Sequence, residues 1–519
     1  MYLPTPSSLL TCSLPLIRSL LPTRSLLLTR SLLLAVIVGT TTLGTAPVGS
    51  QAQLIALKTV PLATGDQFLL LPSERLGMGG VSIALDDMLL DPFINPAKGA
   101  LIDESVLLGT PTFYRISDQN GAGRSLPLTA LFRSDGGFGA ISFALQQLVA
   151  GQSRDIIFFA TDVIWPGPQP RLRDFSATNL YVNGSLGTEL GESGFSVGAG
   201  VSWAGLDALD GVEHLYVLSN GIEQSGHQAD YRAGLFWDRR DQHFEAVLVH
   251  NRFNMKHDVS YIDWRWDQES QRTIVTERVE TNRDRTRTTG LQLGFRRPIT
   301  ESGWRVGGTW TVNRKTHPKI PNYEIMNIPR DPGISWAYDF GVGIAKSSGP
   351  ATFGIDVVVE PIWSNTWAEA AADTVGVNGQ IFHKGDKTVE NDFFFTNVQM
   401  RLGLAYDLEH ASFQAGVEVR SYAYSLKQRD RIQDTKRDQE ESWMEWSPSL
   451  GATAKFSEFE IGYLGRLTTG SGRPGVQRTG ARAEAVSLAA DFIVAPSGPL
   501  TLQDALVITH RVTVSVPIR

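Results

Sequence analysis

The feature that most constrains the fold is an alternation of apolar and polar side chains that returns many times along the chain. Residues 334–344 read ISWAYDFGVGI, in which nearly every second side chain is large and apolar. A period of two is that of a β-strand with one apolar face. The same pattern occurs at 194–204, 288–295, 351–360, 394–406, 412–420 and 458–467. The sequence therefore predicts an all-β protein.

The connections between these segments alternate in length. Short turns occur at 134–137, 191–194, 239–242, 299–303, 346–350 and 407–411. Long polar segments lie between them, at about 148–176, 206–228, 253–287, 314–333, 363–392 and 427–441. Short turns at one end and long loops at the other are typical of outer-membrane barrels, whose apolar face points outward into lipid. We predict a transmembrane antiparallel up-and-down β-barrel of about 14–16 strands.

The two faces of the predicted strands carry different kinds of side chain. The residues expected to face lipid include Trp203, Trp336, Tyr338, Phe340 and Val342. The other face carries charges among many glycines, and opposite charges on neighbouring strands can pair in a wet lumen. The candidate lumen-lining residues are Asp339, Asp356, Glu360, Arg401, Glu418, Arg420, Glu460 and Arg466. The alternative is a soluble exported β-protein that packs its tryptophans in a core.

The N-terminal 52 residues have the composition of a secretory signal peptide. They contain Arg18, Arg24 and Arg30, no acidic residue, and then the apolar run LLLAVIV at 32–38. A membrane anchor is the alternative, but this run is shorter than the roughly 20 residues that a spanning helix needs. The single cysteine, Cys12, lies in this segment, so the mature chain is expected to have none. Disulfides and cysteine-based metal or catalytic sites are thereby excluded.

Residues 76–101, LGMGGVSIALDDMLLDPFINPAKGAL, precede the first clear strand and do not alternate. The glycines permit close backbone packing, and Asn95-Pro96 is a turn signal. The stretch resembles the N-terminal signature of the FadL-type long-chain fatty acid transporters and of their relatives in the secretion-associated PorV group. The matching residues are Gly77, Gly79, Gly80, Ala84, Asp86, Asp87, Asn95, Pro96 and Ala97. Lys98 departs from the pattern, in which a glycine is common at this position.

This resemblance implies a barrel of about fourteen strands with an N-terminal hatch inside its lumen. The expected organisation is a signal peptide at 1–52, a hatch at 53–103 and a barrel at 104–519. The candidate hatch and gating residues are Gly77, Gly79, Gly80, Asp86, Asp87, Asn95, Pro96 and Ala97. The glycines are the candidates for flexibility, and Asn95 and Pro96 are expected to anchor the end of the hatch.

Signals for catalysis and metal binding are weak. Residues 194–198 read GFSVG and fit the nucleophile-elbow pattern, but Ser196 lies within an alternating strand and not at a strand-to-helix turn. His250 and His257 have no carboxylate partner at a helical spacing. We expect no catalytic residue, no metal and no cofactor. With 54 acidic and 47 basic residues, the chain has no charge pattern for nucleic acid.

The resemblance implies a passive outer-membrane conduit for a hydrophobic or amphiphilic small molecule, with membrane lipid around the barrel. The alternative is a PorV-like barrel that transports nothing and binds secretion-system or cargo proteins as a scaffold or shuttle.

Overall fold

The computed structural model describes residues 54–518, apart from 56, 152–175, 213–215, 217–220, 240–241, 269–270, 300–301, 319–331 and 476–500. The predicted signal peptide, residues 1–52, lies outside the described residues. Within the described part, no helix is long and apolar enough to cross a membrane.

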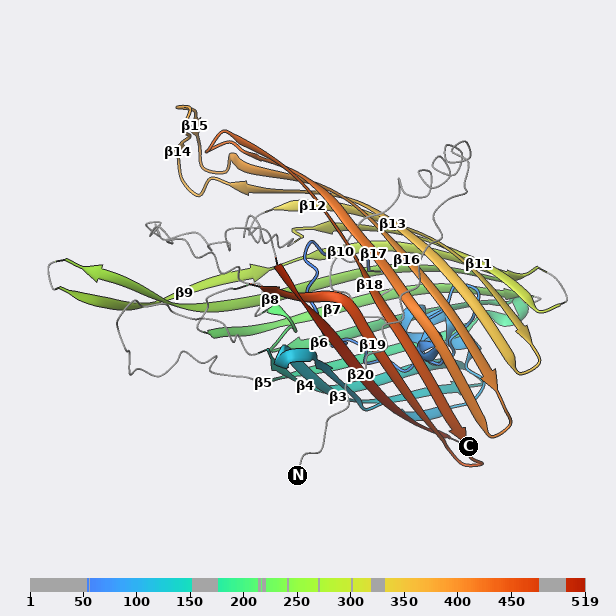
Figure 1. Cartoon of the computed structure of the whole chain (residues 1–519). Helices are drawn as coiled ribbons and strands as arrows, with labels where there is room; N and C mark the ends of the chain where they lie inside the picture. Colours follow the sequence, from blue (N-terminus) through green and yellow to red (C-terminus); the bar gives the residue numbers. More distant parts are fainter. Residues whose placement is uncertain are drawn as a thin grey trace, which may run out of the picture. The chain divides into compact units, whose positions relative to one another are not determined.

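The described chain is built around one large antiparallel sheet (Figure 1). Its strand segments are β1 (Val106–Gly109), β2 (Thr112–Ile116), β3 (Gly121–Ser134), β4 (Gly137–Ala150), β5 (Ser176–Glu189), β6 (Phe195–Leu206), β7 (Gly221–Arg239), β8 (Gln242–Asp267), β9 (Arg272–Asp284), β10 (Arg287–Pro298), β11 (Trp304–Thr316), β12 (Gly333–Ser348), β13 (Ala351–Glu369), β16 (Lys387–Asp407), β17 (Ala411–Asp430), β18 (Thr435–Lys455), β19 (Glu460–Gly475) and β20 (Thr501–Pro517). A separate small hairpin consists of β14 (Thr374–Val375) and β15 (Ile381–Phe382).

The sheet closes on itself as a barrel of sixteen strands. Segments β1 and β2 both pair with β3 on one side and with β20 on the other, so they are two pieces of one barrel strand. Segments β9 and β10 follow one another along β8 and form a second interrupted strand. The eighteen segments of the sheet therefore make sixteen strands. This confirms the predicted fold class, and the fourteen strands implied by the resemblance are two too few.

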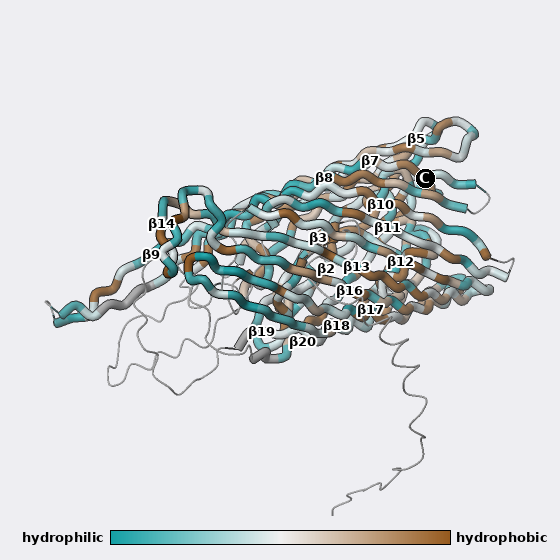
Figure 2. The backbone as a smooth tube through the Cα atoms, turned by 90° about the horizontal axis from the view of Figure 1, so that it is seen from above, coloured by the Kyte–Doolittle hydropathy of each residue, from teal (hydrophilic) through white to brown (hydrophobic). Residues whose placement is uncertain are grey.

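The alternation in the sequence separates the two faces of the barrel wall. Along β12, Trp336, Phe340 and Val342 are 43%, 51% and 63% exposed, whereas Ser335 and Ala337 are completely buried. Figure 2 shows brown, hydrophobic residues recurring along the strands. The large apolar side chains therefore point away from the lumen, which a soluble β-protein would not allow on so many strands.

Exposed aromatic side chains mark two levels on the outer face. Tyr406 lies opposite Ala351 near the short turns, and Phe394 lies opposite Trp363 near the other end of the same strand pair. Twelve residues separate Ala351 from Trp363 along β13, or about 40 Å at ~3.3 Å per residue. At a strand tilt of about 40° this distance spans roughly 30 Å, which is the thickness of the hydrocarbon layer. The apolar outer surface thus has the height of a bilayer core.

Several segments predicted as loops are extensions of strands. Residues 253–267 form the far end of β8 and residues 272–284 form β9, paired from Met255 opposite Asp284 to Asp267 opposite Arg272. The far ends of β17 and β18 likewise pair through 427–430 and 435–438. These extensions are rich in polar and charged side chains, and that polarity led to the prediction of loops. Backbone hydrogen bonds between strands form whether the side chains face lipid or water. A strand with a polar sequence can therefore continue beyond the apolar outer surface.

The segment before β1 contains only short helices among its described residues: η1 (Leu76–Met78), α2 (Asp91–Ile94) and η2 (Pro96–Leu101). Its apolar side chains join buried residues of the wall in several clusters. Ile55 packs with Ala337 and Ile362, while Leu70 packs with Tyr181 and Met255. The hydrophobic core of the molecule therefore lies between the N-terminal segment and the inner wall.

Candidate functional site

The N-terminal segment, here called the hatch (residues 54–103), meets the wall at inward-facing glycines. At nearly all of these glycines, a Cβ atom would come closer than 3.0 Å to a hatch atom, and at Gly451 it would come to 3.4 Å. The glycines are Gly198, Gly234, Gly307, Gly341, Gly343, Gly354, Gly403, Gly416 and Gly451. Their lack of a side chain lets the hatch backbone approach the wall directly. The many glycines of the polar face are the sequence signal for this contact.

The three candidate gating glycines differ in their surroundings. A Cβ on Gly79 would lie 2.9 Å from backbone atoms of Val417, and one on Gly77 would meet Gln414. Gly80 has open space, with the Arg401 side chain 3.9 Å away as its nearest neighbour. Gly79 and Gly80 have φ of 69° and 77°, the left-handed region that favours glycine. Close packing thus explains why glycine occupies positions 77 and 79, and the left-handed backbone is a second reason at Gly79. The part of these glycines in gating stays a prediction.

The Asn-Pro-Ala motif is fixed to the wall by hydrogen bonds. Asn95 is fully buried, and its Oδ1 accepts from the Ala97 N–H at 3.1 Å to cap η2. Its Nδ2 donates to Leu235 O at 3.3 Å and to Glu245 Oε2 at 3.1 Å. Ser196, the serine of the GFSVG motif, donates to Ala97 O at 2.9 Å. Ser196 thus holds the hatch from the start of β6.

Lys98, the departure from the family pattern, lies at the centre of a buried charge cluster. Its Nζ lies 2.5 Å from Asp91 Oδ2, 3.5 Å from Asp86 Oδ1 and 3.9 Å from Glu245 Oε2. Arg296 of the wall also pairs with Asp86. Burial alone would raise the pKa of Asp86, but Lys98 and Arg296 outweigh it and hold this pKa at about 2. The cluster joins the hatch to β8 and β10 by charge.

Asp87 organises the hatch internally. It is 2% exposed and accepts hydrogen bonds from the backbone N–H groups of Glu74 at 3.0 Å and Leu90 at 3.1 Å. Burial, followed by the nearby Asp87 charge, raises the pKa of Glu74 to about 7. Asp87 therefore ties the loop around η1 to the turn before α2.

A second charge network runs along the inner wall of β13 to β19. Glu418 accepts from Arg420 Nε at 2.7 Å and from Arg466 at 2.9 Å, and Arg466 reaches Asp66 of the hatch at 3.4 Å. Asp356 accepts from Ser82 N at 2.7 Å and Ile83 N at 3.1 Å. Buried charges are tolerated when they are paired in this way. The network both lines the lumen and contacts the hatch.

The remaining candidate residues lie as follows. Asp339 and Glu360 face the lumen beside a cavity that is described below, and Arg401 lies 3.9 Å from Asp356. Glu460 begins β19, opposite Lys455 and close to a short turn, outside this network. Trp203 is 43% exposed, and Tyr338 is half-buried on the outer face against Trp363 at 5.8 Å between ring centroids. Facing lipid and lining a conduit remain proposed roles for these residues.

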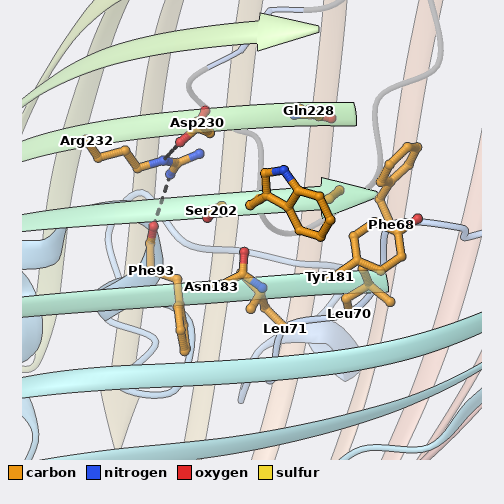
Figure 3. A pocket seen from close by; sticks show the side chains of 12 residues that line it. Phe68, Leu70, Leu71, Phe93, Tyr181, Asn183, Ser202, Gln228, Asp230 and Arg232 are labelled. Atoms are coloured by element: carbon orange, nitrogen blue, oxygen red, sulfur yellow. Dashed lines mark hydrogen bonds and ion pairs between the residues drawn. The ribbon is translucent and has the colours of Figure 1, made fainter. Parts of the chain in front are cut away.

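Cavities lie between the described parts of the hatch and the wall, and two of them have walls of mixed polarity. The first, of about 60 Å³, has Phe68, Leu70 and Tyr181 on one side and Asp230 and Arg232 on another (Figure 3). Arg232 is held there by Asp230 at 2.6 Å and by Phe93 O at 3.2 Å. A small cavity with one apolar and one polar side suits an amphiphilic group. Sequence reasoning missed it because its walls come from the hatch and from three strands.

The second cavity, of about 150 Å³, lies where the hatch faces β7, β8, β10 to β13, β16 and β17. It is lined by apolar hatch residues such as Leu54 and Ile83 and by polar wall residues such as Gln292 and Asn397. Among the described residues, no group of three or more His, Cys, Asp and Glu side chains is arranged to hold a metal ion.

No family model matches the chain, and no curated protein matches it significantly. A FadL homologue from Pseudomonas aeruginosa is 12% identical and covers 88% of this chain and 100% of its own, with a TM-score of 0.43. The toluene transporters TodX of Pseudomonas putida and TbuX of Ralstonia pickettii are each 11% identical, and each alignment covers 86% of this chain and 97% of the transporter. Their TM-scores are 0.36 and 0.38. The chain is thus structurally similar to FadL-type outer-membrane barrels, a likeness that concerns the fold alone.

Proposed function

We propose that this chain is a passive outer-membrane conduit for hydrophobic or amphiphilic small molecules. The observation that carries this proposal is a closed barrel filled by its own N-terminal segment, with cavities of mixed polarity between the two. A structural plug needs no such cavities, whereas a conduit needs places where a ligand can rest on its way. The ligand's own concentration gradient would drive transport.

Passage requires the hatch to move, because the wall glycines bring hatch and wall into direct contact. The contacts that must break are of two kinds: small apolar clusters such as Met78 and Val81 with Ala345 and Ala405, and ion pairs such as Lys98 with Glu245. Both kinds are side-chain contacts, and the hydrogen-bonded strand pairs of the wall do not depend on them. The hatch can therefore shift without unfolding the wall, which supports gating over permanent closure.

A hatch locked to the wall should stop uptake. The Cβ of Val81 lies 3.5 Å from the position of a Cβ on Gly354, which is within the range of a disulfide. We expect a Val81→Cys/Gly354→Cys variant to lose at least about 90% of its uptake of radiolabelled naphthalene and dodecanol by cells when oxidised, and to regain it after reduction. The two single-cysteine variants are the controls. Unchanged uptake by the oxidised variant would refute the conduit.

A scaffold for protein secretion is the second candidate, and the β8–β9 hairpin favours it. This hairpin extends far beyond the aromatic level and is ordered by its own contacts, with the Arg278 guanidinium 4.7 Å from the Tyr261 ring centroid. Removing residues 262–277 would abolish co-purification of secreted cargo if the chain is a scaffold. If it is a conduit, the shortened protein retains uptake.

A further inference from the structure

Five polar side chains occupy matching register positions on consecutive barrel strands, and we call them the acceptor belt. They are Gln292 on β10, Thr311 on β11, Asp339 on β12, Glu360 on β13 and Asn397 on β16. Thr311 faces both Gln292 and Asp339, and Glu360 faces Asn397. Ala337 pairs with Ile362 and Phe340 with Val359, so the positions of Asp339 and Glu360 are directly opposite. Two carboxylates therefore stand side by side, an arrangement that is unfavourable while both are ionised and that a bound cation would relieve.

The belt contains buried acceptors that lack donors. Asp339, Gln292 and Asn397 are each 7% exposed. Asp339 Oδ1, Gln292 Oε1 and Asn397 Oδ1 accept no hydrogen bond within the described structure. All three residues line the second cavity. Buried acceptors of this kind are costly, and their clustering around one space indicates a missing donor group.

The cations near the belt are already engaged. Arg401 donates to Gln399 Oε1 at 2.9 Å and lies 3.9 Å from Asp356, and Arg420 donates to Glu418 at 2.7 Å. Among the fully buried side-chain atoms that the structure describes, Arg401 Nε is a donor beside the belt that makes no hydrogen bond. Lys315, further along β11, is not among the residues that line the cavity. The free acceptor atoms that line the cavity thus still lack a hydrogen-bond donor.

We propose that this cavity binds the primary ammonium head group of an amphiphile. The inference rests on the proposed conduit function and narrows its substrate class. An ammonium has three N–H donors, of which the free Oδ1 of Asp339 accepts one, and the neighbouring Glu360 carboxylate adds a second negative charge. The apolar tail lies against Leu54, Ile83 and Val358, the aliphatic part of the lining. A carboxylate head is repelled by Asp339 and Glu360.

Calorimetry on the refolded full-length protein in neutral micelles at pH 7 tests this assignment with hexylamine, hexanol and hexanoate. These probes share a chain length and differ in the head group. We expect hexylamine to bind saturably and at least tenfold more tightly than hexanol, and hexanoate to bind most weakly. Asp339→Asn should weaken hexylamine binding at least tenfold and leave hexanol binding unchanged. Glu360→Gln, a second and independent change, should weaken hexylamine binding less.

Glu460→Gln is the matched control, because Glu460 is an inward carboxylate that does not line the cavity. This variant should bind hexylamine like the wild type. Hexanoate binding as tightly as hexylamine, or hexylamine binding unaffected by both Asp339→Asn and Glu360→Gln, would overturn the head-group assignment. Failure of the head-group assignment can be told apart from failure of the conduit proposal by the uptake experiment with the Val81→Cys/Gly354→Cys variant. Naphthalene has no head group, so its uptake does not depend on an ammonium site.

Discussion

Replacing Gly79 by alanine is expected to release the hatch from the wall. Gly79 has φ of 69°, and an added Cβ would lie 2.9 Å from the backbone of Val417, which cannot move without distorting β17. The left-handed backbone costs about 1–2 kcal/mol for a residue with a Cβ. Overpacking adds about 1–3 kcal/mol. The measurement is the rate of tryptic cleavage at Arg75 and Lys98 of the hatch, with swelling of liposomes that contain the protein as a second readout.

Gly80→Ala is the matched control for this prediction. Gly80 also has a left-handed backbone, with φ of 77°, but the nearest atom to its added Cβ is on the Arg401 side chain at 3.9 Å. Gly80→Ala therefore has the free-energy cost of a left-handed backbone but no steric clash with the wall. We expect Gly79→Ala to accelerate cleavage and swelling well beyond Gly80→Ala. Equal effects would mean that close packing of Gly79 against the wall does not hold the hatch.

An arginine at Val342 is expected to destabilise the barrel by about 2–4 kcal/mol, the cost of this charge at the bilayer midplane. Val342 is 63% exposed and faces Val357, midway between the aromatic levels at Ala351 and Trp363. Unfolding in denaturant, with the protein reconstituted in lipid vesicles, measures the change.

Val279→Arg is the control, since Val279 is 56% exposed but lies on β9, past the aromatic level. It should change the free energy of unfolding by less than about 1 kcal/mol, as is usual away from the midplane. If both variants were tolerated equally, the exposed apolar face of β12 would not be in hydrocarbon.

Alternation in the sequence was sufficient to predict the architecture, because every strand of a barrel repeats the same pattern of outward apolar and inward polar side chains. The period of two along 334–344 predicted which side chains of β12 face outward, and Trp336, Phe340 and Val342 are exposed as that pattern requires. The lengths of the strands could not be predicted in the same way. Polar segments such as 253–284 continue a strand by backbone pairing alone, and side-chain polarity carries no signal for it.

The candidate site could be predicted only in part. The hatch residues were found through a motif, but the partners of Asn95 and Lys98, such as Glu245, come from strands about 150 residues away. The sequence also indicated that Asp339 and Glu360 face the lumen. That they stand opposite one another depends on the register of β12 against β13, which a single sequence does not specify.

The central claim is that the apolar face of the strands lies in the hydrocarbon of a membrane, and spin labels at Val342 and Val279 test it most directly. The single cysteine, Cys12, lies in the predicted signal peptide, so each site can be labelled through one introduced cysteine. In reconstituted vesicles we predict that the label at 342 is accessible to molecular oxygen and shielded from a water-soluble nickel complex, and that the label at 279 shows the reverse. A label at 342 that collides freely with the nickel complex, or that is shielded from both reagents as in a protein core, would contradict the account.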